Sequence, residues 1–347
     1  MSPTKPSSSR SEPGLDLFRA CAVLAMFAVH ARRLQTAHGD GAGERLLDFL
    51  MWSEPFIAAA FAFMAGVSLV LARERAPSGF STRTFRRSLL LYALACGLFV
   101  PQYGLELPDL LASPGILSAL ALGIASSALA LSSARPELAL GTLIAGVLAL
   151  TAWLDASGVT IPGMNAGPGG AVPLAAFTSF GALAFRLRMR RGPRALVALS
   201  LVTLPLLGVV LLSRFPWTTV RASYYREHAG QLALVDLASD APRVAMSFWN
   251  HSAAGAVALS APLLAALGLA LAAGKRVGSA ALAAPFLVLG RHALLAYVAH
   301  LGLLGLVELA AFAPRSAAGT WLVVSALGAS TTLGAWAFER WRELRTT

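Results

Sequence analysis

One apolar stretch near the amino terminus carries three side chains that could do chemistry. The stretch runs from Gly14 to Arg33 and contains Asp16, Arg19 and His30. At about 100° per residue in a helix, the step of eleven residues from Arg19 to His30 returns almost to the same side, and Asp16 falls within roughly 40° of His30. A helix here would therefore place a carboxylate, a guanidinium and an imidazole on one face.

The chemistry available to these side chains is proton transfer and phosphate binding within a membrane. Imidazole takes or gives a proton near neutral pH, and guanidinium binds phosphate through two parallel hydrogen bonds. Eleven residues rise about 16 Å, so Arg19 and His30 would lie at different depths of the bilayer. Ionisable groups in a spanning helix normally face the bundle interior and mark an active site or a pathway. The alternative is a polar flank in which Asp16 pairs with Arg19 and His30 is interfacial.

The elements that must position these side chains are membrane-spanning helices. Of the 347 residues, 56% are hydrophobic and only 13% are charged. Several segments of about 20 residues carry no charge and lack the alternation of a barrel strand, so the predicted fold class is an all-α, polytopic membrane bundle. Both cysteines, Cys21 and Cys96, lie in apolar segments, which indicates packing and not a disulfide framework.

We predict about ten transmembrane helices, with both termini in the cytoplasm. The approximate limits of the spans are 15–33, 55–73, 87–101, 114–132, 137–154, a segment ending near 185, 194–213, 252–273, 282–312 and 318–338. Residues 1–13, rich in serine and proline, predict a disordered tail, and residues 14–342 a single transmembrane domain. The long polar connection 214–250 is either an interfacial segment that covers an external cleft or an ordinary aromatic belt.

The net charge of +11 follows this predicted topology. Arginines gather in short connections, such as 73–87 and 186–194, that all fall on one side of the membrane, which the positive-inside rule assigns to the cytoplasm. This pattern indicates membrane topology and no nucleic-acid partner. The HExxH and CxxC spacings of metal sites do not occur, so we predict no metal.

The first external connection adds three candidates. His38, Asp40 and Glu54 lie in this connection or at its exit, where one of them could orient His30 or bind an acceptor molecule. A solvated loop is the simpler interpretation of His38 and Asp40. Glu54 lies at the mouth of the second span, where a carboxylate could pair with a histidine or bind a sugar hydroxyl.

Two further segments could contact substrates. Arg86 and Arg87 lie at the cytoplasmic start of the third span, where they could bind phosphate or simply set the topology. The segment LGRHALLAYVAH places Tyr297 and His300 three residues apart on one helix face. His300 is then either a core histidine with satisfied hydrogen bonds or a functional residue. Arg291, on the opposite face, could lie at the inner end of the span.

Four segments resemble a known superfamily. LDLFR, from Leu15 to Arg19, followed after ten residues by His30, resembles the Arg-x10-His signature of the membrane-bound acyltransferase-3 proteins. FAFMAGVSLVLARE and TRTFRRSLLLYALACG resemble the second span and the start of the third span of these proteins. LGRHALLAYVAH resembles the penultimate-span motif of the heparan-alpha-glucosaminide N-acetyltransferase branch of the same superfamily. Residues 135–280 match only in hydropathy.

The resemblance implies an integral-membrane acyltransferase. Such an enzyme moves an acyl group, usually acetyl, from cytoplasmic acetyl-CoA to a hydroxyl or amine of an extracytoplasmic sugar, glycan or glycoside. A bacterial source would place it in the inner, or plasma, membrane. The rival hypothesis is a transporter or flippase that uses the face of Asp16, Arg19 and His30 as a proton or substrate path.

Within the acyltransferase hypothesis the candidate residues take three roles. The catalytic candidates are His30, as base or as transient acyl carrier, with Arg19, Asp16 and Glu54. The candidates for binding the acyl-CoA donor are Arg19, Arg86, Arg87 and Arg291. The candidates for binding the acceptor are His38, Asp40, Tyr297 and His300.

Overall fold

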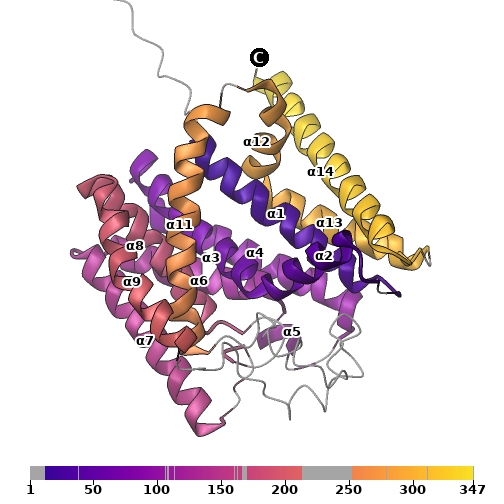
Figure 1. The fold of residues 1–347 in the computed structure, drawn as a ribbon. Coiled ribbons are helices and arrows are strands. Elements are labelled where there is room, and N and C mark those ends of the chain that lie inside the picture. Colours follow the sequence, from indigo (N-terminus) through magenta and orange to yellow (C-terminus); the bar gives the residue numbers. More distant parts are fainter. Residues whose placement is uncertain are drawn as a thin grey trace, which may run out of the picture. The chain divides into compact units, whose positions relative to one another are not determined.

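The structure is a computed structural model in which every regular element is a helix among the residues it describes (Figure 1). These residues are 12–37, 39–105, 107, 109–112, 114–159, 161, 163–165, 170–212, 252–278, 280–310 and 312–346. The all-α fold class is therefore confirmed. His38, the connection 214–250 and residues 1–11 of the predicted tail lie outside the described residues.

The helices form two compact units, each described here by itself. The first unit comprises residues 1–51 and 266–347, and the second comprises residues 52–265. The elements of the first unit are α1 (Pro13–Arg33), α2 (Ala42–Trp52), the second half of α11 (Ala253–Val277), the short η3 (Ala281–Ala283), α12 (Ala284–Arg291), α13 (Ala293–Leu309) and α14 (Ala317–Thr346).

The centre of the first unit is α1, which packs against α12, α13 and α14 (Figure 1). Glycines allow its amino-terminal half to approach two neighbouring helices closely. A Cβ atom on Gly290 of α12 would overlap the main-chain oxygen of Asp16, and a Cβ atom on Gly274 of α11 would overlap the backbone of Gly14. Close backbone packing of this kind is typical of helices in membranes. It fixes the depth of Asp16 in the unit.

The predicted ninth span is not one continuous helix, which corrects the sequence interpretation. It breaks at His292 into α12 and α13, whose axes are bent by 81°. His292 has φ −108° and ψ 30°, which interrupts the regular α-helix. The apolar segments 284–290 and 293–299 flank the break, and no proline marks it, so hydropathy alone predicted one continuous span.

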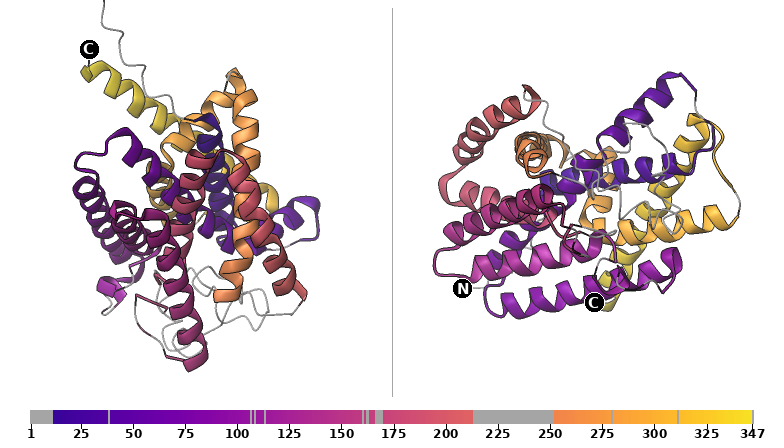
Figure 2. Two further views of the ribbon diagram at one scale, coloured as in Figure 1. Left: turned by 90° about the vertical axis from the view of Figure 1, so that its left-hand side faces the viewer. Right: turned by 90° about the horizontal axis from the view of Figure 1, so that it is seen from below.

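The second unit is built around α8 (Leu174–Arg191), seen from two further directions in Figure 2. This helix packs against α3 (Glu54–Arg75), α6 (Ile116–Ser132), α7 (Pro136–Ser157) and α9 (Arg194–Leu212). Gly66 of α3 and Gly181 of α8 lie where a Cβ atom would overlap a carbonyl group of the facing helix. The remaining elements of this unit are α4 (Phe80–Tyr103), α5 (Asp109–Ala112) and the first half of α11.

Six of the described helices are long and apolar enough to cross a membrane, and the bent pair α12 and α13 would make a seventh. The six correspond to the predicted spans 15–33, 55–73, 114–132, 137–154, 252–273 and 318–338. The other predicted spans are helical but have arginine-rich ends, in α4 and α8, or a shorter apolar part, in α9. One helix, α2, lies in the connection between the predicted spans 15–33 and 55–73, where no helix was predicted.

Candidate functional site

Two of the three polar residues predicted to matter in α1 form an ion pair. Nη1 of Arg19 donates to Oδ1 of Asp16 at 2.9 Å. Asp16 is buried, whereas the side chain of Arg19 keeps 21% of its surface exposed. The buried carboxylate therefore holds a guanidinium that can still contact a ligand.

His30 contacts a residue from the far end of the chain. Its Nδ1 lies 2.9 Å from Nε2 of His300, and the two rings are stacked with centroids 5.1 Å apart. His300 is fully buried, whereas His30 is half-buried. The hydrogen bond needs one proton between the two facing nitrogens, so the tautomer of one ring determines the tautomer of the other.

Aromatic side chains enclose this histidine pair. The ring of Phe27, one turn before His30 on α1, lies 4.7 Å from the ring of His300. The ring of Tyr297 lies 5.3 Å from it, edge to face. Such apolar surroundings keep water away from His300 and strengthen its hydrogen bond to His30.

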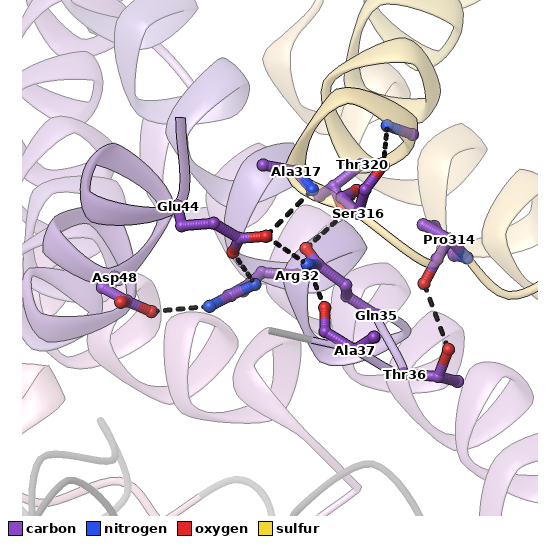
Figure 3. A network of polar contacts seen from close by, with 11 residues as sticks. Arg32, Gln35, Thr36, Ala37, Glu44, Asp48, Pro314, Ser316, Ala317 and Thr320 are labelled. Atoms are coloured by element: carbon purple, nitrogen blue, oxygen red, sulfur yellow. Dashed lines mark hydrogen bonds and ion pairs between the residues drawn. The ribbon is translucent and has the colours of Figure 1, made fainter. Parts of the chain in front are cut away.

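A second polar cluster holds the carboxyl-terminal end of α1 (Figure 3). The buried guanidinium of Arg32 donates to the carboxylate of Glu44 and, at 2.8 Å, to Oδ1 of Asp48. Nε2 of Gln35 donates to Oε1 of Glu44 at 2.8 Å, and the hydroxyl of Thr320 donates to Oε1 of Gln35 at 2.6 Å. The cluster joins α1 to α2 and to the start of α14.

Glu44 is the most connected member of this cluster. Its Oε1 also accepts the backbone N–H of Ala317, the first residue of α14, at 3.0 Å (Figure 3). Burial raises the pKa of Glu44, but the hydrogen bond from Gln35 and the charge of Arg32 outweigh that effect, so the pKa of Glu44 is below its ordinary value. Sequence inspection missed this cluster, although Glu44 and Asp48 share one face of α2 at a spacing of four residues.

A third cluster surrounds the break between α12 and α13. Oε1 of Glu339 on α14 lies 3.0 Å from Nε2 of His292 and 3.3 Å from Nη1 of Arg291. The ring of Phe338 contacts His292 edge to face at 5.7 Å. Arg291, predicted to bind the donor, is thus exposed but already paired. Glu339 was not predicted to have a role.

Four further predicted site residues lie outside α1, α12 and α13. Asp40 is exposed in the connection before α2. Glu54 is buried at the start of α3 in the second unit, and Arg86 and Arg87 are exposed in the second turn of α4 in the same unit. Both arginines are helical, because the helix that contains the predicted third span begins at Phe80. Among the described residues, no group of three or more His, Cys, Asp and Glu side chains could hold a metal ion.

The long apolar helices and the buried ionisable side chains indicate the general class of this protein. Helices long enough to cross a bilayer, with ionisable side chains buried between them, are those of an integral membrane protein. Residues 12–222 match the family model described as heparan-alpha-glucosaminide N-acetyltransferase, catalytic. The match covers more than half of the chain, and the protein belongs to this family. No curated protein matches the chain.

The family match confirms the resemblance noted in the sequence. It includes some of the candidate residues and excludes others. It includes α1 with Asp16, Arg19 and His30. It ends before α13, so His300 and the motif LGRHALLAYVAH lie outside the matched residues. The family is one of acetyltransferases, which makes this protein a membrane-bound member of a transferase family.

Proposed function

We propose that this protein transfers an acetyl group from cytoplasmic acetyl-CoA to a hydroxyl or amine of an extracytoplasmic sugar or glycan. The observation that carries the proposal is the half-buried His30, hydrogen-bonded to His300, on the same helix as the Asp16–Arg19 ion pair. A base and a phosphate-binding cation on one spanning helix suit a reaction whose two substrates arrive from opposite sides.

In the proposed reaction His30 takes the proton of the acceptor. The acceptor's oxygen or nitrogen forms a bond to the acetyl carbon, the bond between that carbon and the sulfur of CoA breaks, and the proton passes from His30 to the departing thiolate. A transient acetyl-histidine is the covalent variant of the same transfer. In either variant His30 must be reachable from the acceptor's side.

The remaining candidates bind the two substrates. Arg19, oriented by Asp16, contacts a phosphate or the pantetheine arm of acetyl-CoA. Its incomplete burial supports this role. The further donor contacts are Arg86, Arg87 and Arg291. The residues proposed for the acceptor side are His38, Asp40, Tyr297 and His300, with Glu54 assisting the base.

We further propose the full topology, with ten spans, both termini in the cytoplasm, a single transmembrane domain over 14–342 and a disordered tail over 1–13. Its support is the arginines at the helix ends that meet in short connections of the second unit, between α3 and α4, α6 and α7, and α8 and α9. The membrane is the inner, or plasma, membrane if the source is bacterial.

The test is acetyl-CoA binding and turnover by the protein in nanodiscs. We expect the wild type to bind acetyl-CoA and to hydrolyse it slowly without an acceptor. Arg19→Ala should lose binding, whereas His30→Ala should keep binding and lose about 100-fold or more in turnover. A wild type with no affinity for acetyl-CoA would refute the proposal and favour the transporter hypothesis for the face of Asp16, Arg19 and His30.

A further inference from the structure

His300 is too specifically placed to be only a packing residue. It lies on α13 and is fully buried, and its Nε2 forms a hydrogen bond of 2.9 Å with Nδ1 of His30. Buried polar atoms in proteins are almost always hydrogen-bonded, so burying an imidazole is costly unless its partners are provided. The partner of His300 is His30, for which we propose the role of base.

The surroundings of the second nitrogen of His300 favour one tautomer. Nδ1 is buried and makes no hydrogen bond among the described residues. In helix α13 the backbone carbonyls of Ala296 and Tyr297, four and three residues earlier, point towards the turn that contains His300. Carbonyl oxygens accept hydrogen bonds and never donate them. They therefore favour a proton on Nδ1 of His300, which leaves its Nε2 as an acceptor.

The tautomer of His30 follows from that of His300. If Nε2 of His300 accepts, Nδ1 of His30 must carry the proton that lies between the rings. A neutral imidazole carries one proton, so Nε2 of His30 is then bare. That nitrogen is the one able to take a proton from an acceptor.

We propose that His300 is a positioning residue that holds His30 in the tautomer whose Nε2 can accept a proton. This inference rests on the proposed function, in which His30 is the base. When the acceptor attacks the acetyl carbon, its proton moves to Nε2 of His30, and the positive charge formed there is stabilised because Nδ1–H donates to His300. The bond from carbon to sulfur breaks, and the departing thiolate takes the same proton from Nε2.

Two substitutions of His300 separate positioning from packing. His300→Gln keeps an acceptor oxygen near the place of Nε2, whereas His300→Leu keeps apolar volume and removes the acceptor. We expect His300→Leu to lower kcat about 100-fold with little change in the KM for acetyl-CoA, and His300→Gln to recover kcat to within about tenfold of wild type. A purely structural role would lower both variants alike.

Leu304→Ala is the matched packing control. Leu304 is buried one turn after His300 on α13, and its truncation removes apolar volume but no hydrogen-bonding group. We expect Leu304→Ala to lower the unfolding temperature at least as much as His300→Leu while kcat stays within about threefold of wild type. A comparable fall in kcat in Leu304→Ala would overturn the positioning role.

Nitrogen-15 NMR of the imidazoles reads the tautomer directly. The chain has six histidines, so His30 can be assigned by comparison with His30→Ala. We expect wild-type His30 to carry its proton on Nδ1, and His300→Leu to lose this preference. A wild-type His30 protonated on Nε2 overturns the inference, as does wild-type kcat in His300→Leu. If His30→Ala itself keeps full turnover, it is the proposed function that fails.

Discussion

The two units of this protein bury different kinds of polar side chain. The buried ionisable residues of the first unit, among those described, are Asp16, Arg32, Glu44 and His300. The described part of the second unit buries mainly hydroxyl groups, and Glu54 is its single buried ionisable residue. The first unit therefore carries most of the buried charge that the structure describes.

The difference lies in where each kind of group finds its partner. A buried hydroxyl can bond within its own helix, as Thr151 does to the carbonyl of Val147 at 2.7 Å. A buried ion needs another side chain as its partner, as Arg32 has in Glu44 of α2 and Asp16 has in Arg19 of its own helix. Such pairs gain little net stability because desolvation is expensive, so they are weak evidence of a need for stability alone. The buried ions of the first unit suit positioning or chemistry, whereas the second unit suits packing.

The first unit repeats this contrast between the two ends of α1. At one end Arg32 is buried and bonded to two carboxylates. At the other end Arg19 pairs with Asp16 of the same helix and keeps 21% of its side-chain surface exposed. The end with Arg32 has the features of a structural clamp, and the end with Arg19 has those of a place for a charged ligand.

The largest predicted loss of stability follows substitution of Arg32. Arg32→Met keeps the apolar stem but leaves buried carboxylate charge without its partner, so we expect the free energy of unfolding to fall by about 3 kcal/mol or more. Thermal or denaturant unfolding in detergent would measure it. Arg340→Met is the control, because Arg340 is exposed, pairs with the exposed Glu343 and lies over the ring of Trp336, and its loss should cost about 1 kcal/mol or less. Equal losses of stability in Arg32→Met and Arg340→Met would contradict the structural role of the buried Arg32.

In the second unit the sensitive positions are glycines. Gly66→Ala would push a methyl group into the backbone of α8, and we expect it to cost about 2 kcal/mol of stability. Gly141→Ala is the control, since no heavy atom lies within 4 Å of a Cβ atom there, and alanine favours the helix by up to about 1 kcal/mol. Unchanged stability in Gly66→Ala would show that α3 and α8 pack less closely at Gly66 than the structure indicates.

Glu44 predicts how the first unit responds to acid. Its pKa in the folded state lies below the ordinary value of 4.5, so its carboxylate adds stability above that pH, and this stability is lost as the pH falls through the lowered pKa. The wild type should therefore be more stable than Glu44→Gln near neutral pH, with a difference that shrinks below about pH 4.5. Unfolding temperatures of both proteins across this range measure the trend. A difference that does not change with pH would contradict it.

The smallest predicted effect is that of a hydroxyl in the second unit. Ser127 and Ser179 lie 3.0 Å apart between α6 and α8, and Ser179 also donates to the carbonyl of Ala175 at 3.2 Å. Ser127→Ala should cost about 1 kcal/mol or less, because Ser179 keeps its bond within the helix. A loss of stability as large as that of Arg32→Met in the same unfolding assay would contradict this prediction. It would mean that this buried hydroxyl contributes as much to stability as a buried ion.

The sequence by itself determined whatever depends on residues close together along the chain. Apolar runs predicted the helices, and helical periodicity predicted that Asp16, Arg19 and His30 share one face. The motif around these residues indicated the family that the match over 12–222 confirms. These properties could be predicted because each follows from the geometry of a single helix.

Only the tertiary structure decided which distant residues meet. His30 and His300 are 270 positions apart, and nothing in either helix alone specifies their contact. Beside the break at His292, Gly290 packs against α1 and Glu339 of α14 contacts His292, and local hydropathy encodes neither contact. Buried ions and buried imidazoles need side-chain partners, because the backbone groups of their own helix are already bonded. For Arg32 and His300 these partners lie on other helices. Their pairing is therefore a property of the folded protein.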